Sequence, residues 1–215
     1  DRTSELTPAT SEITKNIFEA YFDKSEAAVF TGDAEVGAAF SALPFDHLLF
    51  TGGTQIGKKV MKAASENLVP VTLELGGKSP VIVDEDANLS EVAKKVMRGK
   101  TMNAGQICLA PDYLMLPKGK SKEFANASSE VIGEMFEDLK YNEDYTSVIN
   151  ERHYERINEL VADAKEKGAE VLEINPADED FEQQELHKIP PTLVLNPTDA
   201  VSYTHLTLPT TEYVE

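Results

Sequence analysis

The stretch Phe50-Thr-Gly-Gly-Thr-Gln-Ile-Gly57 lies between a short apolar run and a segment with helical spacing. The apolar run 47–50 favours a strand, the glycine pair favours a tight turn, and residues 54–66 favour a helix. This order is typical of an α/β fold. Backbone N–H groups at such a helix start can hold a phosphate, and the glycines leave room for it. The stretch lacks the G-x-G-x-x-G and Gly-Lys-Ser signatures, so alone it predicts neither a dinucleotide site nor an ATPase.

The same alternation of strands and helices continues on both sides of this stretch. Apolar residues at helical spacing predict helices, the first behind a Thr10-Ser11 cap, at 10–22, 89–97, 122–139 and 154–167. Short apolar, β-branched runs predict strands at 27–30, 69–75, 81–83, 113–116, 169–172 and 192–195. The acidic run 178–185 is interpreted as a solvated loop. The sequence therefore predicts an α/β protein.

Composition narrows the class of protein further. The chain has 215 residues, of which 41% are apolar, which is enough to build a core. Twenty Lys plus Arg against thirty-eight Asp plus Glu give a net charge of −18, which disfavours nucleic acid and anionic membranes as partners. A single cysteine allows no internal disulfide and no cysteine-rich metal site, so no metal is expected. Without a long apolar run or a signal segment, the expectation is a reduced, cytoplasmic, soluble protein.

The sole cysteine, Cys108, lies between Gly105 and Pro111. A single cysteine is more often a small buried hydrophobe than a nucleophile. Here the flanking residues place it in a turn after a helix, where its main-chain N–H could face a reacting atom. A reactive thiolate needs such a polar and accessible position. The context therefore favours a nucleophile.

A glutamate, Glu74, interrupts the apolar run Val71–Leu75. A buried carboxylate is costly, so it should be paired, protonated or used, and burial would raise its pKa. That suits a general base working near neutral pH. The alternative is a glutamate at a strand end, satisfied by the backbone N–H groups of the Gly76-Gly77 turn. The residues alone leave both interpretations open.

Together the three stretches resemble the aldehyde dehydrogenase superfamily. Phe50–Gly57 is similar to its nucleotide-contacting turn, Leu73-Glu-Leu-Gly-Gly-Lys-Ser-Pro80 to its general-base signature, and Gly105-Gln-Ile-Cys108 to its nucleophile signature. The interval of thirty-four residues between Glu74 and Cys108 is also the family's. The resemblance runs from about 4 to 199 and is strongest to the branch that contains the coniferyl, fatty and aromatic aldehyde dehydrogenases.

The resemblance implies a chemical role for two residues. Cys108 would attack an aldehyde to give a thiohemiacetal, which passes hydride to NAD and becomes a thioester. Glu74 would activate the water that hydrolyses this thioester, and the Cys108 main-chain N–H would be one oxyanion donor. The partner is thus a small-molecule aldehyde, of the aromatic or medium-to-long-chain class.

The resemblance also implies a cofactor site. Glu5 falls where the family binds the adenosine ribose, and Leu75 falls beside the nicotinamide amide. The turn against the pyrophosphate comprises Thr51, Gly52, Gly53 and Gly57. A carboxylate at Glu5 should repel a 2′-phosphate and favour NAD, whereas Arg2 could compensate that phosphate and leaves NADP open.

The resemblance further implies that the chain is the middle of an enzyme. Residues 1–73 would be part of the nucleotide-binding domain and 74–200 part of the catalytic domain. The family's upstream Pro-Trp-Asn and downstream Glu-Glu-Ile-Phe-Gly-Pro segments are absent. A full-length protein would be a homo-oligomer, and these 215 residues alone should be poorly soluble or molten because their sheet edges are unpaired.

The last residues, 201–215, are different in kind. The segment Val201–Thr211 matches the translation of a transposase adapter used in sequencing libraries. We therefore expect 201–215 to be a non-native tail. The alternative is a threonine-rich strand.

Two other functions stay open. A cysteine hydrolase would need a histidine partner, but His47, His153 and His187 show no known nucleophile-family spacing, and His205 lies in the suspected tail. A truncated, non-catalytic remnant of the same fold is the second alternative.

Overall fold

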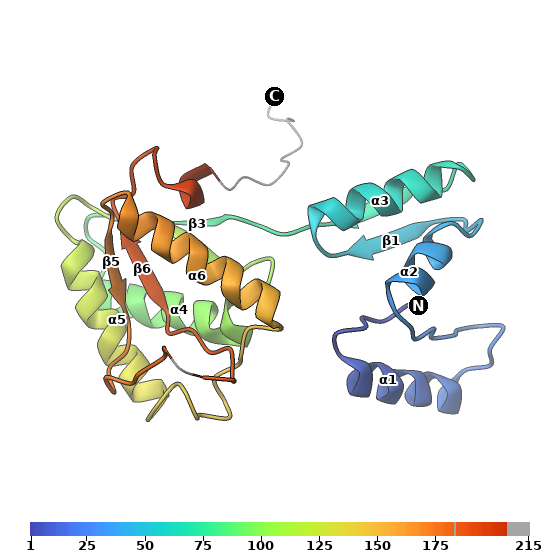
Figure 1. The fold of residues 1–215 in the computed structure, drawn as a ribbon, viewed down its shortest axis with the longest axis horizontal. Coiled ribbons are helices and arrows are strands. Elements are labelled where there is room, and N and C mark those ends of the chain that lie inside the picture. The colour runs from blue at the N-terminus through green and yellow to red at the C-terminus, as the bar shows by residue number, and fades with distance from the viewer. Residues whose placement is uncertain (183, 206–215) are drawn as a thin grey trace. The chain divides into compact units, whose positions relative to one another are not determined.

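The computed structural model describes residues 1–182 and 184–205 and confirms the α/β class (Figure 1). The chain divides into two compact units, Asp1–Leu75 and Gly76–Glu215, called here the N-terminal and C-terminal units. The N-terminal unit contains α1 (Pro8–Tyr21), α2 (Ala34–Ser41), β1 (Leu48–Thr51), α3 (Thr54–Ser65) and β2 (Val71–Glu74). The C-terminal unit contains β3 (Ser79–Ile82), α4 (Leu89–Thr101), η1 (Met102–Gly105), β4 (Pro111–Met115), α5 (Ser121–Met135), α6 (Glu151–Glu166), β5 (Glu170–Glu173), β6 (Thr192–Leu195) and η2 (Ser202–His205).

The N-terminal unit is built on a parallel pair of strands, β1 and β2. Leu48 lies opposite Val71, and Thr51 lies opposite Glu74 at the carboxyl end of the pair. Helix α3 packs against these strands through Val60 and other buried residues of a small apolar core. Because β1 runs into α3 through a glycine turn, this turn lies at the same edge as the end of β2. Ligands bind at this edge of open α/β sheets.

The C-terminal unit has the larger core. Helices α4 and α5 pack closely, and their apolar faces form a cluster with loop and strand residues that includes Ala93, Met97, Phe124 and Ile132. Strands β3 and β4 are parallel, whereas β5 and β6 are antiparallel, with α6 packed on β5 (Figure 1). The pairing of β3 with β4 skips Asp112, which forms a bulge between Pro111 and Tyr113.

Most predicted elements are present, with four corrections. The predicted strand 27–30 forms only an isolated parallel bridge between Arg2 and Phe30, flanked by main-chain hydrogen bonds that join residues 1–3 to Ala28 and Phe30. Helix α1 begins at Pro8, so Thr10 and Ser11 lie inside it rather than capping it. Helix α2, capped by the Asp33 side chain, was not predicted. Helix α5 ends at Met135 rather than at 139.

The acidic run 178–185 is only in part the solvated loop that its charge predicts. The carboxylate of Glu179 accepts hydrogen bonds from the main-chain N–H groups of Leu139, at 2.6 Å, and Lys140, at 2.9 Å. This residue therefore joins two loops, while Asp178 and Glu182 are exposed. Position 183 lies outside the described residues, as do 206–215, which hold most of the predicted tail and of the alternative strand.

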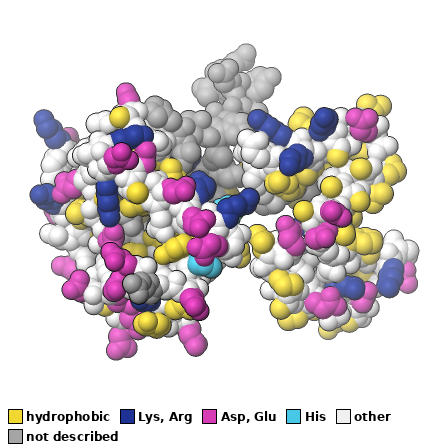
Figure 2. All heavy atoms as spheres, in the orientation of Figure 1, with side chains coloured by type: hydrophobic (Ala, Val, Ile, Leu, Met, Phe, Trp, Pro, Cys, Tyr) yellow, Lys and Arg dark blue, Asp and Glu magenta, His cyan; other side chains and the backbone are white. Residues whose placement is uncertain are grey.

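Acidic side chains are spread over the visible face of both units (Figure 2). Among the described residues, no helix is long and apolar enough to cross a membrane. Within the same residues, no group of three His, Cys, Asp or Glu side chains could hold a metal ion.

Candidate active-site loops

Cys108 lies in a tight turn between η1 and β4. Its side chain is exposed, and the turn is closed by a hydrogen bond from the Ala110 N–H to the Ile107 carbonyl oxygen, at 3.0 Å. Ala110 itself is buried, and Pro111 begins β4 directly after it. The accessible turn expected from the flanking Gly105 and Pro111 is thus confirmed.

The backbone that leads to this turn is left-handed over three residues. Asn103, Ala104 and Gly105 have φ values of 50°, 51° and 74°. Glycine adopts this conformation freely, but the other two residues each cost about 1–2 kcal/mol. A Cβ at Gly105 would also lie 3.2 Å from the carbonyl oxygen of Lys100. The surrounding structure must therefore hold this segment in place.

The Gly76-Gly77 segment, expected as a turn, is an irregular connection between β2 and β3, and it lies against the Cys108 turn. The segment and the turn each precede one of two paired strands, since Ser79 of β3 lies opposite Pro111 of β4. A Cβ at Gly77 would lie 2.3 Å from the main-chain oxygen of Cys108, closer than real Cβ contacts allow. The second glycine of the Leu73–Pro80 signature is therefore required by the approach of the cysteine turn.

A buried carboxylate, Asp112, fixes the start of β4. It forms an ion pair with Lys78 and lies 4.0 Å from the ammonium of Lys100. Burial lowers the pKa of Lys100, an effect that Asp112 opposes. The Tyr203 hydroxyl donates a hydrogen bond to the Asp112 carboxylate, and the centre of the Tyr203 ring lies 3.6 Å from the Lys78 ammonium. Burial raises the pKa of the Tyr203 hydroxyl.

Glu74 is not buried, so that expectation is wrong. It is the last residue of β2, and its side chain is exposed. The strand pairs with β1 alone among the described residues, which leaves its end open to solvent. No described residue of the N-terminal unit donates a hydrogen bond to the carboxylate, whereas its main-chain oxygen accepts one from Gly52 at 3.0 Å. Glu74 belongs to the N-terminal unit and Cys108 to the C-terminal unit.

The glycine turn leaves the N-terminus of α3 open. Gly53 is the N-cap residue and offers no capping side chain, and a Cβ placed on it would meet nothing within 4 Å. The Thr54 hydroxyl is buried and has no hydrogen-bond partner among the described residues. Gly52 has no such space, since a Cβ there would lie 2.5 Å from the Phe50 ring. The N-terminus of α3 thus offers uncapped backbone N–H donors, the positive end of a helix dipole and a hydroxyl without a partner among the described residues. A phosphate group could bind to these groups.

Gly57 and Leu75 meet beside this turn. Gly57 is buried in α3, and a Cβ on it would lie 3.0 Å from the Leu75 side chain. The close packing explains why a glycine stands at this position. The structure thus places Leu75 together with the predicted turn residues Thr51, Gly52, Gly53 and Gly57.

Glu5 lies in an exposed loop and is paired with Arg2. The Arg2 guanidinium donates to the Glu5 carboxylate at 2.8 Å and to the main-chain oxygens of Gly32, at 3.1 Å, and Asp33, at 2.7 Å. A backbone hydrogen bond and the Arg2 hydrogen bond hold the pKa of Glu5 below its usual range. No hydrogen bond or ion pair between described residues joins Glu5 to the glycine turn.

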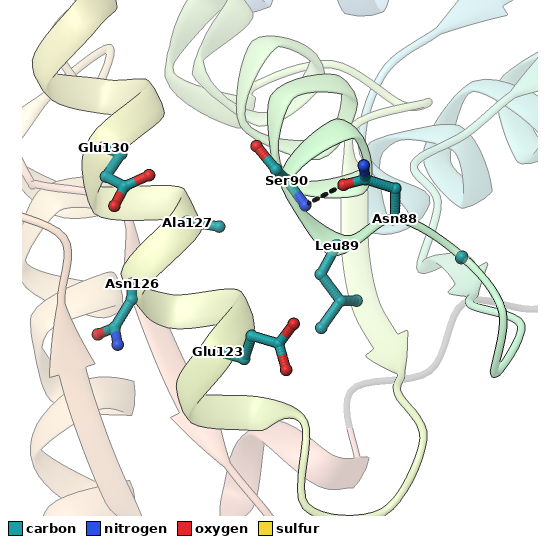
Figure 3. Close-up of a pocket in the computed structure, with 8 residues that line it drawn as sticks. Asn88, Leu89, Ser90, Glu123, Asn126, Ala127 and Glu130 are labelled. Atoms are coloured by element: carbon teal, nitrogen blue, oxygen red, sulfur yellow. Dashed lines mark hydrogen bonds between the residues drawn. The ribbon is translucent and has the colours of Figure 1, made fainter.

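A surface hollow of about 440 Å³ lies between the start of α4 and the face of α5 (Figure 3). The Asn88 side chain already accepts hydrogen bonds from the first N–H groups of α4, at 3.0 Å from Ser90 and 3.3 Å from Glu91. Glu123 and Glu130 line the opposite wall. Satisfied donors and two carboxylates do not suit an anionic ligand, so this hollow is not a second phosphate site.

Sequence reasoning missed one residue of the cysteine loop, Gln106. Its side-chain amide forms hydrogen bonds with Asn103, Ser147 and Ile149. The available signal was its place two residues before the cysteine, but an uncharged amide gave no chemical reason to single it out.

The fold and these two loops define an α/β chain with an open helix N-terminus in one unit and an exposed, tightly supported thiol in the other. The chain belongs to the aldehyde dehydrogenase family, whose model matches residues 2–205. It is 56% identical to the "Probable coniferyl aldehyde dehydrogenase" of Caulobacter vibrioides and 52% identical to the coniferyl aldehyde dehydrogenase of a Pseudomonas species. Each alignment covers 91% of this chain, and 40% and 41% of those proteins, respectively.

Solved structures agree with this assignment. The aldehyde dehydrogenase of Mycobacterium tuberculosis, crystallised with NAD⁺, superposes with a TM-score of 0.79 at 25% identity and covers 94% of this chain and 42% of that chain. The chain thus spans about two fifths of the length of the relatives that it matches.

Proposed function

We propose that this segment carries the nucleophile and part of the cofactor site of an enzyme that oxidises an aldehyde to a carboxylic acid with NAD, NADP being the alternative cofactor. The observation that carries the proposal is the exposed Cys108 thiol in a turn supported by Gly77. An exposed thiol on a rigid turn is available to attack a carbonyl carbon. Membership of the aldehyde dehydrogenase family supports this chemistry.

The proposed reaction begins at the Cys108 thiolate, which forms a bond to the aldehyde carbon. The carbonyl oxygen becomes an oxyanion, to which the Cys108 main-chain N–H donates. The nicotinamide ring, when bound, supplies the acceptor for the hydride that leaves this carbon. The resulting thioester is attacked by water, and Glu74 takes the water's proton. Cleavage of the carbon–sulfur bond releases the carboxylic acid and restores the thiolate.

The N-terminal unit would hold the cofactor. The open N-terminus of α3, with Gly53 and the Thr54 hydroxyl, would bind the pyrophosphate, and Glu5 the adenosine ribose. Leu75, which packs on Gly57, would lie beside the nicotinamide. The NAD⁺ bound by the Mycobacterium tuberculosis relative supports this choice. The names of the two coniferyl relatives support an aromatic aldehyde as substrate.

Two substitutions in an enzyme of the family's full length that carries this segment test the proposal. Cys108→Ser should abolish both NADH formation and ester hydrolysis. Glu74→Gln should release a burst of about one NADH per site and then stall at the thioester, because proton removal from water is lost. Glu170→Gln is the matched control, since Glu170 is also an exposed glutamate in a short strand. Turnover by Cys108→Ser would overturn the proposal, and steady turnover by Glu74→Gln at the wild-type rate would remove Glu74 from its role.

The contacts of the histidines do not support a cysteine hydrolase. The His47 ring is bonded to the Thr72 hydroxyl, and the rings of His153 and His187 lie against Arg152 and Glu151. A nucleophile–histidine pair needs a hydrogen bond between thiol and ring. No hydrogen bond to Cys108 from these three rings occurs in the described structure. A non-catalytic remnant would show neither the burst nor thiol-dependent ester hydrolysis.

A further inference from the structure

The side-chain amide of Gln106 makes three hydrogen bonds, all of them with main-chain groups. Its nitrogen donates to the carbonyl oxygens of Asn103 and Ser147, both at 3.0 Å. Its oxygen accepts from the N–H of Ile149 at 2.9 Å. No charged side chain is among these partners. One amide thus connects the segment before Cys108 to a loop more than forty residues further along the chain.

The local bonds of Gln106 close the left-handed segment. The main-chain N–H of Gln106 also donates to the main-chain oxygen of Asn103 at 3.0 Å. The side-chain amide of Asn103 donates in return to the main-chain oxygen of Gln106 at 3.3 Å. These bonds bracket Ala104, which has a φ of 51°. Because this conformation is unfavourable for alanine, reciprocal bonds across it are what keeps the segment from relaxing.

The distant bonds of Gln106 end on a loop that is itself fixed. The Val148 N–H donates to the His187 oxygen at 2.9 Å, and the Tyr145 hydroxyl donates to the Ile189 oxygen at 2.6 Å. The buried Lys188 ammonium donates to the main-chain oxygens of Tyr145 and Asn142. Residues 147–149 are therefore a firm support rather than a loose surface loop.

We propose that Gln106 is a positioning residue for Cys108. The Gln106 amide holds the cysteine turn at a fixed position relative to residues 147–149, so that the Cys108 thiol and its main-chain N–H both face the reacting carbonyl group of the substrate. The downstream side of the turn is fixed by β4 and by Asp112, and the upstream side depends on this amide. The inference rests on the proposed function of Cys108. A small displacement of a reacting group costs up to about a hundredfold in rate.

Gln184 offers a matched control. Its side chain also donates to two main-chain oxygens, those of Phe181 at 3.1 Å and Lys188 at 2.7 Å, and accepts from the Lys188 N–H at 2.9 Å. None of these partners lies in residues 102–110. The Gln184 amide also donates to the Tyr154 hydroxyl at 3.5 Å. Gln106→Met and Gln184→Met each remove two bonds to main-chain oxygens and one from a main-chain N–H at similar side-chain volume, so a purely structural role predicts an effect at least as large for Gln184→Met.

The first experiment compares these variants in a full-length family enzyme that carries the segment. Gln106→Met should lower kcat about tenfold or more, change the KM for NAD less than about twofold, and shift the pH profile of Cys108 alkylation by iodoacetamide. Gln184→Met should lower the melting temperature comparably, and because it reaches residues 147–149 only through Lys188, it should lower kcat and shift the alkylation profile less than Gln106→Met does. Equal losses of kcat and unchanged alkylation profiles in both variants would overturn the proposal.

The second experiment uses Gln106→Glu, which can regain a donor. The ionised carboxylate accepts from Ile149 but repels the oxygens of Asn103 and Ser147, whereas the protonated acid can donate to one of them. The ratio of variant to wild-type kcat should therefore rise several-fold from about pH 8 to about pH 6. A flat ratio, equal to that of Gln106→Met, contradicts the proposal.

Failure of the proposed function gives a different pattern. If the wild-type enzyme forms no NADH, the nucleophilic role of Cys108 is wrong. The alkylation profiles still compare Gln106→Met with Gln184→Met, because alkylation needs neither aldehyde nor cofactor. A shift that is larger in Gln106→Met than in Gln184→Met then supports the positioning of the thiol by Gln106, and identical profiles exclude it.

Discussion

The α-carbon of Gly77 faces the main-chain oxygen of Cys108 so closely that a side chain on it would lie 2.3 Å from that oxygen. Gly77 lies in the connection that precedes β3 and Cys108 in the turn that precedes β4, and the two strands pair with each other. Gly77 and Cys108 are therefore packed against each other within the C-terminal unit.

Gly77→Ala should displace the Cys108 turn. The clash is with backbone, which cannot swing away, so we expect a loss of about 1–3 kcal/mol in the free energy of unfolding and at least a tenfold loss in kcat. Gly133→Ala is the control, because its Cβ would make an ordinary contact of 3.5 Å with Pro176 and alanine favours the helix. Urea unfolding and steady-state kinetics of both variants measure the effect. Wild-type kinetics in Gly77→Ala would show that the turn can move without consequence.

Thr54→Val should separate stability from cofactor binding. The buried Thr54 hydroxyl has no partner among the described residues, so its replacement by a methyl group should leave the free energy of unfolding unchanged or raise it slightly. If the hydroxyl donates to a cofactor phosphate, the Kd for NAD should rise about tenfold. Calorimetric titration with NAD and urea unfolding provide the two values. An unchanged Kd would mean that the phosphate lies elsewhere.

Glu5→Gln should shift cofactor preference toward NADP. The substitution removes a negative charge from the proposed ribose site and releases the Arg2 guanidinium from its 2.8 Å ion pair. Both changes favour a 2′-phosphate, so the ratio of the Kd for NADP to that for NAD should fall about tenfold. Fluorescence titrations with the two cofactors measure this ratio. Glu12→Gln, at an exposed helix position, serves as the control. A ratio that stays constant would place the ribose away from Glu5.

His153 should make stability depend on pH. Burial lowers its pKa, and Arg152 and Arg156 lower it further. Between this lowered pKa and the ordinary value of 6.5, the unfolded chain binds more protons than the folded chain, so stability rises with pH in that window. Above the window the contribution of this group is constant. Urea unfolding at a series of pH values should show that His153→Gln flattens the slope, and an unchanged slope would assign it to other groups.

Sequencing the source DNA past Ala200 tests the predicted tail. A library made without transposase should lack the adapter codons if residues 201–215 are non-native. Finding the same codons by this method would establish the tail as part of the protein. The contacts of Ser202 with Asp163 and of Tyr203 with Asp112 would then be native interactions.

Apolar periodicity predicted α3, α4 and α5 because each has one buried face. The same periodicity predicted α1, although Ile13, Ile17 and Tyr21 of that helix are exposed. Helix α2 escaped because Ala34–Ser41 is short and small-residue rich, and its main signal is the Asp33 cap. The segment 27–30 has strand composition but finds no continuous partner, and partners cannot be seen in a local pattern.

The site shows the same division between local and distant causes. The exposed turn of Cys108 could be predicted from its neighbours in the sequence, Gly105 and Pro111. The burial of Glu74 was wrongly expected because exposure at the end of β2 depends on which strands pair with it. Gln106 was missed because its hydrogen-bond partners Ser147 and Ile149 are over forty positions away in the sequence.

The exposure of Cys108 also makes the chain vulnerable to peroxide. An accessible thiolate is oxidised first to a sulfenic acid, which another thiol can capture as a disulfide. These 215 residues hold no second cysteine, so no other thiol of this segment can make that capture. Without capture by a thiol, oxidation proceeds to the irreversible sulfinic acid. The same exposure that lets the thiol attack a carbonyl therefore makes the time for which it stays reduced depend on the concentration of other thiols.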